Sequence, residues 1–115
     1  MTDSPIDLTV YSELKATTGP EFVVELVKTF LEEAPGMLAE LRRARASGDA
    51  DRFRRAAHSL KSNANTFGAT SLAAKARDLE LKGLDTDPAR DEVALADLET
   101  EHAGAATALK ALCND

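Results

Sequence analysis

The sequence predicts an all-α protein, an antiparallel up-down four-helix bundle with a short extra N-terminal helix as a lid. Apolar residues recur at three- and four-residue spacing over long stretches, and no segment alternates apolar and polar residues as a strand would. Glycine, proline and capping residues divide the chain into helix-length segments with short turns, which favours antiparallel neighbours. At 115 residues we expect one domain, residues 1–115, in which residues 1–5 form a loose start.

The first two helices are predicted from their start signals. Asp7 is the expected N-cap of a short helix that ends near Lys15. Pro20 suits the first position of a long amphipathic helix that ends near residue 46. The apolar stripe of this helix continues across Pro35, so we expect a bend one turn before the proline and not two helices.

Three more helices follow. Gly48 and Asp49 end one helix and cap the next, which is predicted over residues 50–66. Thr70 or Ser71 is expected to cap a fourth helix, which ends near residue 82. Asp87 followed by proline at position 88 opens a last helix, which frays before the C-terminus.

The polar face of the helix over residues 50–66 is where we expect the function. The apolar residues of this segment fall on one side, and His58 points the other way. Its neighbours at helical spacing are all polar: Arg54, Arg55, Lys61 and Ser62. An imidazole on a wet helix face, one turn from a lysine and beside a hydroxyl, is placed to exchange a group with an outside partner.

This segment resembles the histidine phosphotransfer (HPt) family, whose modules relay phosphoryl groups in two-component signalling. The resemblance rests on Ala57-His58-x-Leu60-Lys61 and on Gly68-Ala69 ten residues past the histidine. The sequence departs from the family pattern at Ser62, where glycine is usual. Serine is small enough to be tolerated there, and we expect it to affect the transfer rate or the choice of partner.

The resemblance implies a role for each polar residue. His58 carries the phosphoryl group on Nε2, and an imidazole with the unperturbed pKa of ~6.5 has a free ring nitrogen at pH 7. Lys61 supplies positive charge to the phosphoryl oxygens, and Ser62 donates a hydrogen bond to them. If the helices on either side of Ala69 are antiparallel, Glu80 lies level with His58 and is a candidate partner for Nδ1. The alternative is that Glu80 is a solvated surface carboxylate.

The implied partners are response-regulator receiver domains, a hybrid histidine kinase, or both. We expect a receiver to dock over the His58 face and over an apolar surface at the lid end. The expected contact residues are Val10, Leu14, Phe22 and Phe67, together with Arg54 and Asn65. No cofactor is expected, because the Mg²⁺ of the transfer reaction belongs to the receiver domain. We expect the protein to be a monomer.

Composition excludes several other classes of protein. A net charge of −6 argues against nucleic acid as a partner. The cations are nevertheless clustered: Arg42, Arg43, Arg45, Arg52, Arg54, Arg55 and Lys61. No apolar run reaches membrane-spanning length, no signal peptide is apparent, and Cys113 is the only cysteine, so we expect a cytoplasmic protein.

Enzyme and metalloprotein readings are weaker. No glycine-rich phosphate loop is present, so we expect a phosphocarrier without an ATP site and not an enzyme. Glu99-x-x-His102 resembles half of a di-metal motif, but Arg55 stands three residues before the only other histidine. We therefore expect His102 to pack in the core or at its boundary.

A second class of function stays open: a helical docking or adaptor protein in which His58 is not phosphorylated. This hypothesis predicts partner binding that is indifferent to His58→Ala. The presence of both His58 and Lys61 favours the phosphotransfer reading. The initial methionine favours a free-standing protein over a module of a larger kinase.

Overall fold

The computed structural model describes residues 5–113, which contain five α-helices and no strand. The helices are α1 (Leu8–Thr18), α2 (Pro20–Ser47), α3 (Ala50–Thr66), α4 (Thr70–Lys82) and α5 (Pro88–Cys113). The all-α prediction is confirmed. The expected loose start, residues 1–5, lies outside the described residues apart from Pro5.

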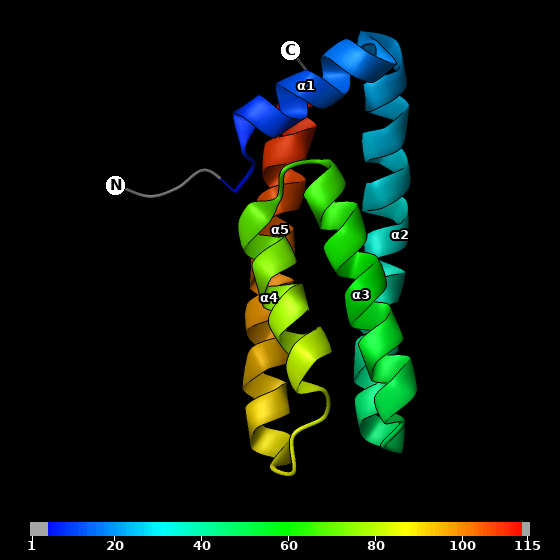
Figure 1. Cartoon of the computed structure of the whole chain (residues 1–115), viewed down its shortest axis with the longest axis vertical. Helices are drawn as coiled ribbons and strands as arrows, with labels where there is room; N and C mark the ends of the chain where they lie inside the picture. Colours follow the sequence, from blue (N-terminus) through cyan, green and yellow to red (C-terminus); the bar gives the residue numbers. More distant parts are fainter. Residues whose placement is uncertain (1–4, 114–115) are drawn as a thin grey trace, which may run out of the picture.

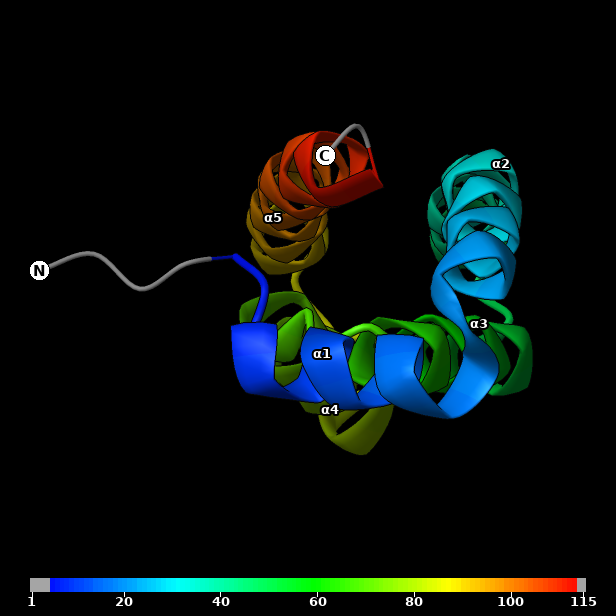
Figure 2. The ribbon, with the colours of Figure 1, turned by 90° about the horizontal axis from the view of Figure 1, so that it is seen from above.

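The four longer helices lie alongside one another, and α1 crosses one end of them (Figures 1 and 2). The second helix contacts α3 and α5, and α4 contacts the same two helices. Helix α1 contacts α2 and α3. The loop between α4 and α5 lies at the end far from α1 (Figure 1). None of the helices in residues 5–113 is both apolar enough and long enough to cross a bilayer.

Aromatic, leucine and alanine side chains share the core. The large side chains that are almost fully buried include Phe30, Phe53 and Leu60. Fully buried alanines such as Ala57 and Ala64 lie between them on α3. Small residues let neighbouring helices approach closely, so α3 packs tightly against both α2 and α4 although the chain has few aromatics.

The predicted N-caps of α1 and α3 are confirmed. Oδ1 of Asp7 accepts a hydrogen bond from the backbone N–H of Thr9 at 3.0 Å. Oδ1 of Asp49 accepts one from the backbone N–H of Arg52 at 3.0 Å. Helix α1 continues to Thr18, three residues further than predicted, and the hydroxyl of Thr18 donates to the carbonyl of Leu14 at 2.8 Å.

The predicted cap of α4 is wrong. Neither Thr70 nor Ser71 caps the helix; both lie within it, and Ala69 occupies the N-cap position without a side-chain hydrogen bond. The backbone of Ala69 explains this. Its N–H donates to the carbonyl of Ala64 at 2.9 Å, and its own carbonyl accepts from the N–H of Ala73 at 2.9 Å. The tight turn after α3 therefore starts α4 one residue early.

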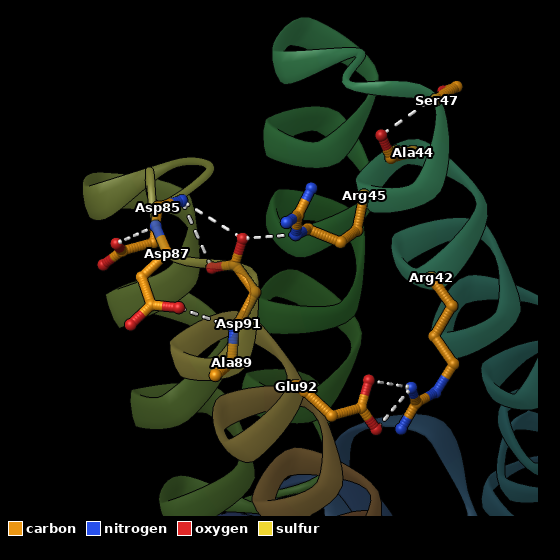
Figure 3. A network of polar contacts seen from close by, with 9 residues as sticks. All are labelled: Arg42, Ala44, Arg45, Ser47, Asp85, Asp87, Ala89, Asp91 and Glu92. Atoms are coloured by element: carbon orange, nitrogen blue, oxygen red, sulfur yellow. Dashed lines mark hydrogen bonds and ion pairs between the residues drawn. The ribbon is translucent and has the colours of Figure 1, made fainter.

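Helix α2 is unbroken across Pro35, and the bend expected there stays a prediction. Near its C-terminal end, Arg42 joins α2 to α5. Its guanidinium pairs with the carboxylate of Glu99 through two bonds of 2.7 Å. Nη1 of Arg42 donates to the two carboxylate oxygens of Glu92, at 2.9 and 3.0 Å (Figure 3). Arg42 thereby links the two longest helices at their surface.

A second polar link fastens the α4–α5 loop, and its only signal in the sequence is an acidic residue in the first turn of α5. Asp91 is buried, with only 3% of its surface exposed. Its two oxygens accept from the backbone N–H of Asp85 at 3.1 and 3.2 Å. Arg45 of α2 forms an ion pair with it at 2.8 Å (Figure 3). The α4–α5 loop is therefore fixed through Asp91 to α5, and through the pair of Asp91 with Arg45 to α2 as well.

Candidate functional site

His58 lies in the middle of α3, on the face that the helix turns to solvent. Its side chain is 57% exposed. Ala57 before it and Leu60 after it are fully buried. The helix is thus anchored on both sides of the histidine, and this anchoring presents the imidazole outward on a rigid element.

One carboxylate joins the two residues of the H-x-x-K motif. Nδ1 of His58 lies 2.7 Å from Oε2 of Glu80 on α4. Nζ of Lys61 forms an ion pair with the other oxygen, Oε1, at 2.7 Å. Glu80 is therefore not a solvated surface group, because the packing of α3 against α4 places it between two partners.

The electrostatics of Glu80 determine which nitrogen of His58 carries the proton. The Lys61 ammonium, and after it the hydrogen bond with His58, lowers the pKa of Glu80 although partial burial opposes this. An ionised carboxylate only accepts hydrogen bonds. Nδ1 of His58 must therefore be the protonated nitrogen and donate to Glu80, which leaves the lone pair on the outward-facing Nε2.

A shallow hollow surrounds the imidazole on the α3–α4 side, and Asp51, Arg54, Arg55 and Ser59 line it with His58 and Glu80. Arg54 and Arg55 both pair with Asp51, at 3.2 and 3.1 Å. Ser62 and Asn65 are exposed further along α3.

The members of the cationic cluster seen in the sequence are paired with carboxylates in the structure. Each of its seven members forms an ion pair with a carboxylate. The partners are Glu40, Asp51, Glu80, Asp91, Glu92 and Glu99. The face around His58 therefore carries charges of both signs, and because Arg54 and Arg55 share the single carboxylate of Asp51, one positive charge beside His58 stays uncompensated.

The expected docking residues divide into two groups. Phe22 is 55% exposed at the start of α2, and Val10 and Leu14 of α1 are half-buried. Phe67 does not belong with them. It is only 3% exposed, and its ring centroid lies 5.2 Å from that of Phe30. As the residue that ends α3, it turns its ring into the core, so it offers no surface to a partner.

His102 packs at the core boundary as predicted. Its ring meets that of Phe30 edge-on, with centroids 6.2 Å apart. Nε2 is buried and has no hydrogen-bond partner in residues 5–113. Burial, and to a smaller extent the charge of Lys110, lowers the pKa of His102. Within the same residues, no three His, Cys, Asp or Glu side chains cluster as metal ligands would.

The fold and this site agree with one class of protein. The Hpt domain family matches residues 25–114, most of the chain, so the chain belongs to the Hpt domain family.

Among solved structures, the chain is similar to the crystal structure of histidine-containing phosphotransfer protein B (HptB) from Pseudomonas aeruginosa PAO1. The two share 25% sequence identity and superpose with a TM-score of 0.83, over 98% of this chain and 97% of that one. No curated protein matches the sequence.

Proposed function

We propose that this protein is a histidine phosphotransfer protein of a two-component phosphorelay. His58 accepts a phosphoryl group on Nε2 from an aspartyl phosphate of a receiver domain and passes it to another receiver. Membership of the Hpt domain family supports this role. The observation that carries it is the 2.7 Å contact between Nδ1 of His58 and Glu80, which directs the reactive lone pair to solvent.

The remaining site residues act on the phosphoryl group. Lys61 neutralises the charge on its oxygens, and the exposed hydroxyl of Ser62, one helical turn from His58, donates a hydrogen bond to them. The protein acts as a phosphocarrier and binds neither ATP nor a cofactor of its own. Mg²⁺ is supplied by the receiver domain.

The proposal also includes the partner surface and the state of the protein. A receiver domain, free or within a hybrid histidine kinase, docks across the His58 face and the α1 end. The contact residues are Val10, Leu14 and Phe22 with Arg54 and Asn65. The protein works as a cytoplasmic monomer whose α2 to α5 form an antiparallel up-down bundle, an arrangement that the contacts of α2 and α4 with both α3 and α5 support.

A transfer assay tests this function. Receiver domains loaded with labelled phosphoryl groups are mixed with wild type, His58→Gln and His102→Gln. His102 is the matched control because it is the only other histidine. We expect acid-labile, base-stable label on wild type and His102→Gln, and none on His58→Gln. Label that persists on His58→Gln contradicts the assignment, and label on none of the three across a broad receiver panel favours the adaptor function.

A further inference from the structure

The Lys61 ammonium is already engaged in the structure, although the proposed function needs it at the phosphoryl group. It lies 2.7 Å from Oε1 of Glu80, while His58 occupies Oε2 of the same carboxylate. Before transfer, the one negative charge of Glu80 faces the positive charge of Lys61 and the Nδ1–H of His58. Attack on phosphorus requires an unprotonated Nε2, and in that state the three side chains together are electrically neutral.

Transfer changes this balance. The lone pair of Nε2 attacks phosphorus, the bond from phosphorus to the aspartyl oxygen breaks, and its electron pair stays on the aspartate carboxylate. Because Nδ1 keeps its proton, the ring of His58 becomes a cation, and a phosphoryl dianion appears beside it. Glu80 then lies beside two positive charges, the Lys61 ammonium and the His58 ring. The phosphoryl oxygens carry two negative charges and have no ammonium beside them.

We propose that Glu80 is the counter-ion of two cations in turn: Lys61 in the resting protein, and the phosphorylated imidazolium of His58 after transfer. The exchange frees the Lys61 ammonium, whose flexible four-carbon stem lets it turn to the phosphoryl oxygens. Each charge keeps an opposite partner in both states. This inference rests on the proposed function and names Glu80 as a positioning residue for it.

The exchange has a consequence for pH dependence. Transfer onward breaks the Nε2–phosphorus bond and returns its electrons to the ring, which is easier while Nδ1 stays protonated and the ring is cationic. A carboxylate in contact with Nδ1 favours the protonated ring, whereas the amide of glutamine can turn to donate to the neutral ring. Glu80 therefore keeps phosphorylated His58 competent for transfer to higher pH.

Other charged groups near the ring do not replace Glu80. On α3, Arg54 and Arg55 are paired with Asp51, and on α4 Arg77 is exposed one turn before Glu80. Toward α2, the groove beyond Arg55 and Ser59 is lined by the acidic Glu32, Glu33 and Glu40 with Arg43 and Arg52. None of these forms an ion pair or hydrogen bond with His58 within residues 5–113.

The test measures the onward-transfer rate of labelled protein between pH 6 and 9 for wild type, Glu80→Gln, Glu80→Asp and Asp97→Asn. Asp97 is the matched control, because it pairs with Lys75 of α4 at 2.5 Å and has no contact with His58. We expect the alkaline midpoint of the rate to fall by about one pH unit in Glu80→Gln. Glu80→Asp should recover part of this shift, and Asp97→Asn should match wild type.

Lysine side-chain NMR follows the other half of the exchange. In wild type, the Nζ signal of Lys61 should shift on phosphorylation. In unphosphorylated Glu80→Gln no carboxylate contacts Lys61, so its Nζ signal should already differ from that of unphosphorylated wild type. If label is accepted but the midpoint of Glu80→Gln equals that of wild type, or the Lys61 signal does not respond, the exchange is wrong and the carrier function stands. If wild type accepts no label, the proposed function fails and the exchange fails with it.

Discussion

The backbone N–H of Asp7 donates a 2.7 Å hydrogen bond to the carbonyl of Gly68, which joins the start of α1 to the turn between α3 and α4. Gly68 has a φ of +78°, and a Cβ there would lie 2.8 Å from the carbonyl oxygen of Asp7 and 2.9 Å from Cβ of Val10. The position thus requires glycine for its backbone conformation and also for the close approach of α1.

Gly68→Ala should therefore destabilise the protein by more than the backbone penalty alone. We expect a loss of about 2–4 kcal/mol in the free energy of unfolding, measured by urea denaturation. Gly48→Ala is the matched control, because its φ is +73° but no atom lies within 4 Å of a Cβ there. Gly48→Ala should lower the free energy of unfolding by about 1 kcal/mol, the penalty of the left-handed conformation alone. Equal losses in the two variants would show that the contact with α1 contributes nothing.

Removal of the buried carboxylate on α5 should release the α4–α5 loop. Asp91→Ala leaves Arg45 and the N–H of Asp85 without their partner, and we expect a loss of about 2–3 kcal/mol. Hydrogen exchange should show faster exchange of the Asp85 amide. Asp97→Ala breaks the exposed pair with Lys75 and should cost at most about 0.5 kcal/mol. A similar small loss for Asp91→Ala would contradict the link between loop and helix.

His102 should make the folded state sensitive to mild acid. Its pKa in the folded protein is lower than in the unfolded chain, where it is ~6.5. As the pH falls through ~6.5, His102 therefore binds a proton in the unfolded chain before it does so in the folded protein. The free energy of unfolding decreases over this range, until the pH is below the pKa of His102 in the folded protein. Urea unfolding at pH 7.5 and 5.5 should show this loss in wild type and a smaller one in His102→Gln.

The acidic groups do not obscure this window. The pKa values of Glu40 and Glu99 are lowered by their arginine partners, Arg52 first and Arg42 first respectively. The stability that ionised Glu40 and Glu99 contribute is present above the ordinary pKa of glutamate, and it is lost only as the pH falls well below 5. An equal loss in wild type and His102→Gln between pH 7.5 and 5.5 would rule out His102 as its source.

Phe22 should contribute to partner binding without contributing to stability. With 55% of its surface exposed, Phe22→Ser should change the free energy of unfolding by no more than about 0.5 kcal/mol. Its loss from an interface should weaken receiver binding about tenfold, measured by calorimetry. Val93 of α5 is 71% exposed, and Val93→Ser is the control. Unchanged affinity in Phe22→Ser, or the same loss in both, would place the receiver elsewhere.

Much of the fold could be predicted because its signals are local. Asp7 and Asp49 cap their helices as expected, and Pro20 and Pro88 stand first in theirs. The cap of α4 could not be predicted, because Ala69 is held by backbone bonds to Ala64 and Ala73, which no residue preference reveals. The burial of Phe67 could not be predicted for a similar reason. Periodicity puts it on the apolar side of α3, and only the turn that follows decides whether that side is covered.

The sequence by itself determined the helices, the core face of α3 and the outward position of His58, because caps and helical periodicity depend on neighbours within a few residues. The tertiary structure decided which side chains meet. Glu80 between His58 and Lys61, Asp91 against Arg45, and the pairs of Arg42 with Glu99 and of Arg52 with Glu40 all depend on how the helices are registered against one another. That register is set by the fit of the whole core, and residues far apart in the chain contribute to it together.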